Sequence, residues 1–337
     1  MAARDIEYVE LYTADANAVI DYFDTALGFT QVAESVDIRS NSVLLRQGEM
    51  RLVVTTGPGT RQFLEAHGDG IADIAFRCDD VAATHTVALA AGATDLGAPH
   101  GSPTVSGFGS VAHTLLPATA ERGGLPAGRT WIPFTGAAPK PVGRIRLLDH
   151  VAICVEGGTL DKHAGFYARA FGLSWYSAES VEVGDSSMDS VVVRSDSGGV
   201  TFTLVAPGGL AGKGQLDAFL ERNGGAGVQH LAFLVDDIVS AVRETDKVEF
   251  LKTPASYYDA LADRFTGMRE EIADLRATNV LADRDEWGYL LQLFTRSPHP
   301  RNTLFYELIQ RRGSRGFGSN NIRALYEAVE RDRLAAQ

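Results

Sequence analysis

Two stretches of this 337-residue chain decide its fold, because one repeats the other without a gap. The first is Gly68-Asp-Gly-Ile-Ala-Asp-Ile-Ala-Phe-Arg-Cys-Asp-Asp-Val81, and the second is Gly225-Ala-Gly-Val-Gln-His-Leu-Ala-Phe-Leu-Val-Asp-Asp-Ile238. Each reads as an apolar strand that runs into a helix. A repeat with so long a period indicates that the chain is built from duplicated structural units.

The repeat continues on both sides of these stretches. Upstream, Ile6-Glu-Tyr-Val-Glu-Leu-Tyr12 matches Leu148-Asp-His-Val-Ala-Ile-Cys154, and a helical pattern with apolar residues at i, i+3 and i+4 follows each. Alternating β segments come next, Ser42 to Thr56 and Asp189 to Val205. The unit therefore reads β-α-β-β-β, twice per half. We expect an α+β fold in which tandem β-α-β-β-β modules pair into two half-barrel domains around cavities.

The boundary between the halves is marked by composition. Residues Pro117 to Gly143 are rich in Pro, Gly and Ala and show no sustained period, which is typical of a connection. We predict an N-terminal domain over 1–117, a connection over 118–145 and a C-terminal domain over 146–337. In the first domain we expect His113 to serve the packing of its own half, and in the second we expect His299, between two prolines, to be exposed.

Charge and composition exclude several classes of function. The 31 Lys and Arg residues against 43 Asp and Glu residues leave a net charge of −12, which disfavours binding to nucleic acid or to an anionic membrane. No apolar run approaches the roughly 18 residues of a membrane-spanning helix, and the first residues contain no apolar signal core. We therefore expect a cytoplasmic protein, with Cys78 and Cys154 as buried, inert thiols.

The two halves differ at a few positions that carry reactive side chains. Tyr8 of the first half corresponds to His150 of the second, and Asp73 corresponds to His230. A third ionisable group, Glu307, interrupts the apolar strand Thr303-Leu-Phe-Tyr-Glu-Leu-Ile309. Three such groups at separate strand centres would be costly to bury without a shared partner, and a divalent metal ion is the simplest one. Two imidazoles and one carboxylate suit non-haem Fe(II), whereas zinc more often takes three histidines or thiolates.

At these residues the sequence resembles the 4-hydroxyphenylpyruvate dioxygenase and 4-hydroxymandelate synthase family of the vicinal oxygen chelate superfamily. The resemblance covers nearly the whole chain. The motifs that carry it follow in family order: Leu148-Asp-His150, Gly227-Val-Gln-His230, Gly288-Tyr-Leu-Leu-Gln-Leu-Phe-Thr295, Leu304-Phe-Tyr-Glu-Leu-Ile-Gln-Arg311 and Gly316-Phe-Gly-Ser-Asn-Asn321.

The resemblance implies that His150, His230 and Glu307 bind Fe(II), and that the N-terminal domain is a structural copy without a metal site. It implies 4-hydroxyphenylpyruvate and O₂ as substrates, with no separate 2-oxoglutarate. Catalytic roles carry over to Gln292, Ser190 and Asn321, and a gating loop leads into a helix from Ile322 to Leu334. Substrate contacts carry over to Thr203, Val205, Gln215, Gln229, Phe294, Phe305, Phe317 and Ile322.

Two products are compatible with this family, 4-hydroxymandelate from benzylic hydroxylation and homogentisate from ring hydroxylation with side-chain migration. Where the dioxygenases carry Pro-x-Asn-Glu-Pro, this chain has Thr203-Leu-Val-Ala-Pro207, and Ile322 replaces a phenylalanine. Losing a flat ring and a polar tether lets the substrate ring shift. We therefore expect a 4-hydroxymandelate synthase, with homogentisate formation as the alternative and a non-catalytic small-molecule-binding module as a remote one. Exposed sheet edges are compatible with a homodimer.

Overall fold

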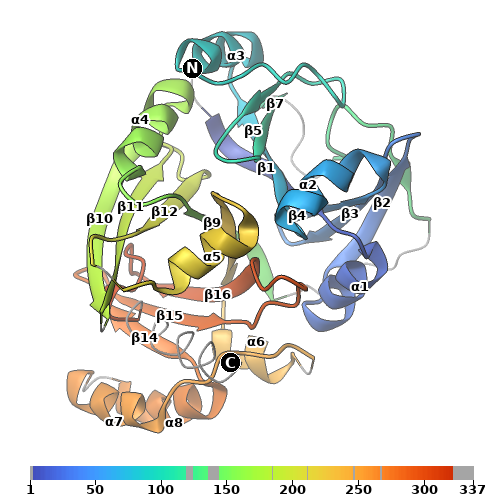
Figure 1. Cartoon of the computed structure of the whole chain (residues 1–337). Coiled ribbons are helices and arrows are strands. Elements are labelled where there is room, and N and C mark those ends of the chain that lie inside the picture. The colour runs from blue at the N-terminus through green and yellow to red at the C-terminus, as the bar shows by residue number, and fades with distance from the viewer. Residues whose placement is uncertain are drawn as a thin grey trace.

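The computed structural model describes residues 3–118, 124–135, 144–183, 185–210, 212–245, 247–265 and 268–321. These residues form two eight-stranded sheets, each curled into a half-barrel, which lie beside one another (Figure 1). The predicted α+β class and the paired half-barrels are confirmed. Within the described ranges, no helix is long and apolar enough to cross a membrane.

The N-terminal half contributes the first sheet. Its elements are β1 (Ala3–Tyr12), α1 (Ala16–Asp21), the π-helical turn η1 (Tyr22–Ala26), β2 (Thr30–Val36), β3 (Asn41–Gln47), β4 (Met50–Thr56), η2 (Pro58–Thr60), α2 (Arg61–His67), β5 (Gly70–Cys78), α3 (Val81–Ala90), β6 (Thr104–Ser106), β7 (Ala112–Pro117) and β8 (Ile132–Pro133). The strand order is β6-β7-β5-β1-β4-β3-β2-β8.

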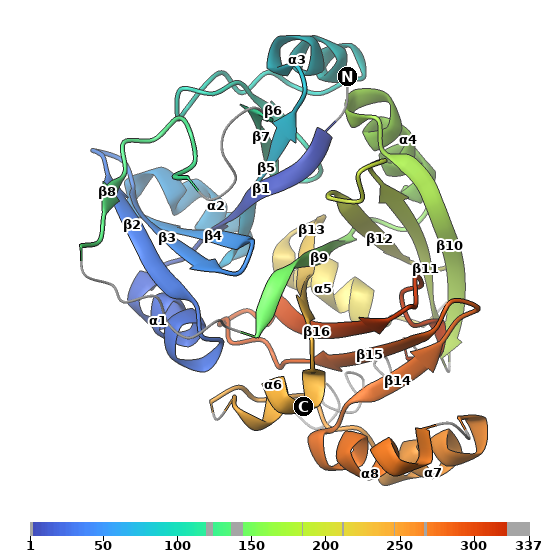
Figure 2. The same ribbon diagram turned by 180° about the vertical axis from the view of Figure 1, so that it is seen from behind.

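The C-terminal half contributes the second sheet. Its elements are β9 (Ile145–Cys154), α4 (Leu160–Phe171), β10 (Ser174–Val183), β11 (Ser186–Arg194), β12 (Thr201–Pro207), α5 (Gln215–Asn223), β13 (Gly227–Val235), α6 (Ile238–Arg243), α7 (Ala255–Arg264), α8 (Arg269–Thr278), β14 (Leu281–Arg284), β15 (Tyr289–Phe294) and β16 (Phe305–Arg312). The strand order is β10-β11-β12-β9-β13-β16-β15-β14, so β9 and β13 occupy its middle (Figure 2).

The repeated stretches form equivalent strand-to-helix units. They become β5 with α3 and β13 with α6, and the second aspartate of each Asp-Asp pair caps the helix. Asp80 accepts a hydrogen bond from the backbone N–H of Ala83 at 3.0 Å, and Asp237 accepts one from Ser240 at 3.1 Å. A capping carboxylate satisfies an N–H group that has no partner inside the helix, which is why both helices begin at this point.

The modules are not all complete. Within the predicted N-terminal domain, 1–117, only two strands, β6 and β7, follow α3, where the repeat predicts three, and an isolated bridge between Asp95 and Val105 replaces part of the missing strand. The predicted connection also contributes structure, because its strand β8 pairs with β2. The next strand, β9, begins at Ile145, the last residue assigned to the connection.

The two halves share one core through reciprocal aromatic packing. On one side Phe23 of η1 contacts Tyr306 of β16, with ring centroids 5.1 Å apart. On the other side, the hydroxyl of Tyr167 of α4 forms a hydrogen bond of 2.8 Å with Nε2 of the buried His113 of β7. Each half thus packs its first helix against a strand of the other. His113 also packs within its own half, as expected, since its ring stacks on Phe76 with centroids 4.4 Å apart; the contact with Tyr167 is an additional role.

His299 is also part of the junction, not an exposed loop residue as the sequence suggested. It is 4% exposed and lies 2.8 Å from the hydroxyl of Tyr306 and 3.4 Å from the carboxylate of Asp69. The flanking prolines misled the interpretation because the loop folds back onto the N-terminal half. Both cysteines are free and fully buried, as expected.

The junction provides a stability test. Phe23 is 0% exposed, and Phe23→Ala should lower the free energy of unfolding by about 3–5 kcal/mol, because it opens a cavity between the halves. Ile38 is 95% exposed, and the control Ile38→Ala should change it by less than about 0.5 kcal/mol. Urea denaturation of both variants measures the difference; equal midpoints would contradict the assigned packing.

Candidate metal centre

The three predicted ligands meet on the concave face of the C-terminal sheet. One ligand atom from each of His150, His230 and Glu307 lies within 4.8 Å of the others, and all three side chains are buried. The Nε2 atoms of His150 and His230 lie 3.4 and 3.3 Å from the same oxygen of Glu307, Oε2. Three potential ligand atoms therefore converge on one point.

Strand register explains this convergence. Ala232 of β13 pairs with His150 of antiparallel β9 and with Glu307 of parallel β16, so these two side chains flank it. His230 lies two residues earlier on β13, which places it on the same face of the sheet. The donor set fits a divalent ion that accepts nitrogen and oxygen ligands. Burial lowers the pKa of His230, which favours the neutral ring that metal binding requires.

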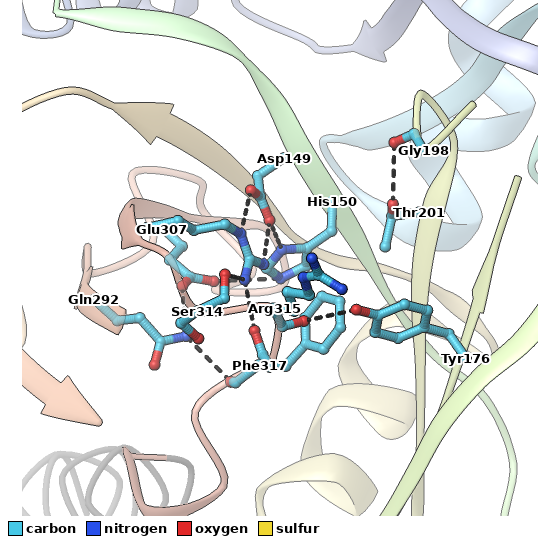
Figure 3. A network of polar contacts seen from close by, with 12 residues as sticks. Asp149, His150, Tyr176, Gly198, Thr201, Gln292, Glu307, Ser314, Arg315 and Phe317 are labelled. Atoms are coloured by element: carbon cyan, nitrogen blue, oxygen red, sulfur yellow. Dashed lines mark hydrogen bonds and ion pairs between the residues drawn. The ribbon is translucent and has the colours of Figure 1, made fainter. Parts of the chain in front are cut away.

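Glu307 is held by a chain of amide contacts. Gln292 of β15 donates from Nε2 to Oε1 of Glu307 at 2.9 Å and to the carbonyl of Phe317 at 3.2 Å. Its own carbonyl oxygen accepts from Asn321 at 3.0 Å, and Asn321 accepts from Tyr257 at 2.8 Å. Since one carboxylate oxygen is occupied by Gln292, the other is left to face the histidines (Figure 3).

His150 and His230 have different neighbours. His150 lies with Nδ1 3.0 Å from the Asp149 carboxylate, which also accepts two hydrogen bonds from Arg311 at 2.7 Å. Burial alone would raise the pKa of Asp149, but the hydrogen bonds from Arg311 and His150 outweigh it and hold that pKa below its usual range. His230 stacks on Phe305 with ring centroids 4.9 Å apart.

A cavity of about 60 Å³ adjoins the three ligands, and its walls are mainly apolar. Of the predicted pocket residues, these line it: Ser190, Thr203, Val205, Gln215, Gln229, Gln292, Phe294 and Phe317. Phe305 contacts His230 from the side, and Asn321 lies behind Gln292. Ile322 and the predicted helix to Leu334 fall outside the described residues.

Two polar atoms in the cavity wall have no partner. The buried Oγ1 of Thr203 and Oε2 of Glu179 make no hydrogen bond within the part of the chain that is described. Buried polar atoms in folded proteins are nearly always paired, so an orphan that lines a cavity points to a bound polar group.

Comparison with known proteins places these features in a family. The profile described as "Hydroxyphenylpyruvate dioxygenase, HPPD, N-terminal" matches residues 1–113, and the profile of the "Glyoxalase/Bleomycin resistance protein/Dioxygenase superfamily" matches residues 149–266. A 4-hydroxyphenylpyruvate dioxygenase from Pyricularia oryzae is 32% identical over 80% of this chain and 70% of that protein. The chain belongs to the 4-hydroxyphenylpyruvate dioxygenase family.

Other members of this family extend the match to the whole chain. The 4-hydroxyphenylpyruvate dioxygenase from Neurospora crassa is 29% identical over 97% of this chain and 90% of its own length. The solved structure of a triple mutant of 4-hydroxymandelate synthase from Streptomyces coelicolor is 50% identical, with a TM-score of 0.90 over 99% of this chain and 100% of that one. The similarity is therefore higher to this synthase than to either dioxygenase.

Reasoning from sequence missed several residues of the site. Asp149 and Arg311 stand inside quoted family motifs, and their roles become visible only because Asp149 contacts His150 and Arg311 holds Asp149. Ser177 and Glu179 of β10, with Met188 and Val192 of β11, also line the cavity. The available signal was the spacing of two residues between Ser177 and Glu179 and, through Ser190, between Met188 and Val192, since alternate residues share a face.

Among the residues that the structure describes, the corresponding place in the N-terminal half holds no such ligand set. Tyr8 and Asp73 occupy the positions of His150 and His230, and the register gives Thr114 the position of Glu307. The carboxylate of Asp73 accepts from the backbone N–H of Thr114 at 2.9 Å and contacts the hydroxyl of Tyr8 at 3.4 Å. Asp73 thus bonds to Tyr8 and to Thr114, at the positions where the other half has two imidazoles and a carboxylate.

This buried acid makes stability depend on pH. Burial, followed by the charge of Glu10, raises the pKa of Asp73 from 3.8 to about 7. A carboxyl with a raised folded-state pKa costs stability as pH rises from its unfolded value to its folded value. Asp73→Asn keeps an acceptor for Thr114 but has no carboxyl to ionise. It should therefore remove this loss of folding stability at high pH, which is at most on the order of 4 kcal/mol.

Denaturation of metal-free protein at pH 4.5 and pH 8 tests this prediction. The wild type should lose stability between the two pH values by more than the variant does. The same pH dependence in both proteins would show that Asp73 does not carry an elevated pKa.

Proposed function

We propose that the chain is a 4-hydroxymandelate synthase. It would convert 4-hydroxyphenylpyruvate and O₂ to 4-hydroxymandelate and CO₂, with Fe(II) bound by His150, His230 and Glu307. The observation that carries this proposal is the convergence of these three buried ligands beside a cavity with mainly apolar walls, in a chain 50% identical to a 4-hydroxymandelate synthase.

Fe(II) bound by one carboxylate and two imidazoles would supply the open coordination positions that a 2-oxo acid and dioxygen need. The residues of the chain would prepare the rest of the reaction. Gln292 keeps Glu307 turned toward the histidines, and the buried position of all three ligands excludes bulk water. Water exclusion favours oxidation of the substrate over side reactions.

The cavity walls suit an aromatic substrate. Phe294 and Phe317 line the cavity and offer ring edges and faces for the substrate ring. The unpaired hydroxyl of Thr203 supplies a partner for the phenol group, since a threonine hydroxyl can both donate and accept. Val205 contributes only an apolar surface where the dioxygenase motif carries asparagine.

Product choice would follow from the position of the ring. With Thr203 and Val205 in place of proline and asparagine, the ring can settle so that the benzylic carbon, and not a ring carbon, faces the reacting oxygen. Ile322 belongs to the same hypothesis, and its contribution stays a prediction.

Product analysis tests the proposed function directly. Purified protein loaded with Fe(II) and given 4-hydroxyphenylpyruvate in air should release 4-hydroxymandelate, identified by chromatography against standards because homogentisate has the same mass. Removal of the metal by a chelator, or Glu307→Ala, should abolish turnover. Homogentisate as the main product would overturn the synthase assignment while leaving the metal site in place, and binding without turnover would favour a non-catalytic module.

The phenol contact provides a second test. Thr203→Val should lower kcat/KM for 4-hydroxyphenylpyruvate by about tenfold, equivalent to about 1.4 kcal/mol for one hydrogen bond, and should leave kcat/KM for phenylpyruvate nearly unchanged. Thr201 lies on the same strand and bonds to the carbonyl of Gly198, so Thr201→Val is the matched control. An equal loss with both substrates would show that Thr203 does not contact the phenol.

A further inference from the structure

A β-bulge in β9 lies directly beside the proposed metal ligands. Ala232 and Phe233 are consecutive on β13, yet they pair with His150 and Leu148, so Asp149 is the extra residue. Neighbouring side chains of a regular strand point to opposite faces. A bulge re-aims a side chain, and here it brings the Asp149 carboxylate to 3.0 Å from Nδ1 of His150.

This contact determines which ring nitrogen of His150 carries a proton. An ionised carboxylate only accepts hydrogen bonds, so Nδ1 of His150 is the nitrogen that carries the proton. In the neutral ring Nε2 then carries the lone pair, and Nε2 is the atom that lies 3.4 Å from Glu307. Asp149 itself cannot turn away easily, because Arg311 donates to both of its oxygens at 2.7 Å.

Arg311 reaches beyond this pair to the loop that follows β16. Its Nη1 donates to the carbonyl of Gly316 at 2.6 Å, and its guanidinium group lies 5.2 Å from the ring of Phe317. The same phenylalanine ring meets the ring of His150 edge-on at 5.3 Å (Figure 3). One arginine therefore connects the partner of a proposed metal ligand to the loop whose Phe317 lines the cavity.

The loop leads back to a second ligand. The carbonyl of Phe317 accepts from Gln292, and Gln292 donates to Glu307. Gly318 makes this approach possible, since its φ is +79° and a Cβ at this residue would lie 2.0 Å from the Gln292 side chain. A continuous series of contacts therefore links His150 to Glu307 through Asp149, Arg311, the loop and Gln292.

The N-terminal half contains the same bulge without the same consequence. Glu7 is the extra residue there, between Ile6 and Tyr8. Its carboxylate pairs with Arg51 and Arg77, and the residue that follows it is Tyr8. The bulged acid is therefore shared architecture, and only in the C-terminal half does it contact a histidine.

We propose that Asp149 and Arg311 are positioning residues that fix His150 with Nε2 toward the metal and tie this orientation to the loop Gly313–Gly318. This inference rests on the metal site of the proposed function. Partners of this kind around a metal ligand typically change metal affinity by about 10- to 100-fold when removed.

The first experiment needs no substitution in Asp149. Long-range ¹H–¹⁵N spectra of metal-free protein at pH 8 report which ring nitrogen of each histidine carries the proton, and His150→Gln identifies the signals of His150. We expect the proton on Nδ1. A ring without a proton on Nδ1 would overturn the proposal.

The second experiment measures metal affinity without turnover. Asp149→Asn retains the shape but can donate from its amide to Nδ1, which would move the ring proton to Nε2. Anaerobic competition with a chromophoric Fe(II) chelator should show affinity falling by about 10- to 100-fold. Glu7→Gln is the matched control and should leave the affinity and the His150 signals unchanged. Wild-type affinity in Asp149→Asn would overturn the proposal.

The third experiment tests the connection to the loop. Fe(II) binding to the wild type should slow amide hydrogen exchange across residues 313–318, because coupling between two sites is reciprocal. In Arg311→Lys, which keeps the charge but loses the forked geometry, this protection should largely disappear. Equal protection in both proteins would contradict the coupling.

These readouts separate the inference from the proposed function. If 4-hydroxymandelate is not formed but Asp149→Asn still weakens Fe(II) binding and shifts the ring proton, the product assignment is wrong and the positioning role stands. If 4-hydroxymandelate is formed and Asp149→Asn binds Fe(II) like the wild type, the positioning role is wrong and the function stands.

Discussion

The metal centre depends on one pairing constraint, the position of Ala232 between two neighbouring strands. Antiparallel pairing with β9 and parallel pairing with β16 place His150 and Glu307 on either side of it. A larger side chain at this position would occupy the space between the ligands. A shift of either strand by one residue would turn its ligand to the other face of the sheet. The strand register of the curled sheet therefore determines the geometry of the site.

Duplication explains why only one half carries this chemistry. Both halves use the same bulge, the same strand order around the central pair and the same aspartate caps. In the N-terminal half the equivalent positions have become a self-satisfied polar cluster. Helices α7 and α8 form an addition of the C-terminal half, and Tyr257 of α7 supports the Asn321 and Gln292 contacts behind Glu307. The added helices therefore contact the site indirectly, because Tyr257 bonds to Asn321 and Asn321 bonds to Gln292, which lines the cavity.

The sequence was sufficient for the fold class, the repeat and the three residues that converge, because each leaves a local or periodic signal. Asp149 was missed for a different reason. A bulge is a property of strand pairing and not of one strand, so nothing in the sequence places Asp149 beside its neighbour. The roles of His113 and His299 at the junction were missed because each also contacts a residue of the other half, Tyr167 and Asp69 respectively, and contacts across so long a separation leave no periodic signal.

The reciprocal aromatic packing has a consequence for how the protein can be divided. Phe23 from one half and Tyr167 from the other are fully buried, and each contacts a buried residue of the opposite half. Separating the halves would therefore expose aromatic surface on both pieces, including Tyr167 and Tyr306 on the half that holds the candidate metal ligands. Selection on the half without the ligand set would then act through solubility and lifetime of the whole chain, because its sequence is constrained by the surface that it presents to the other half.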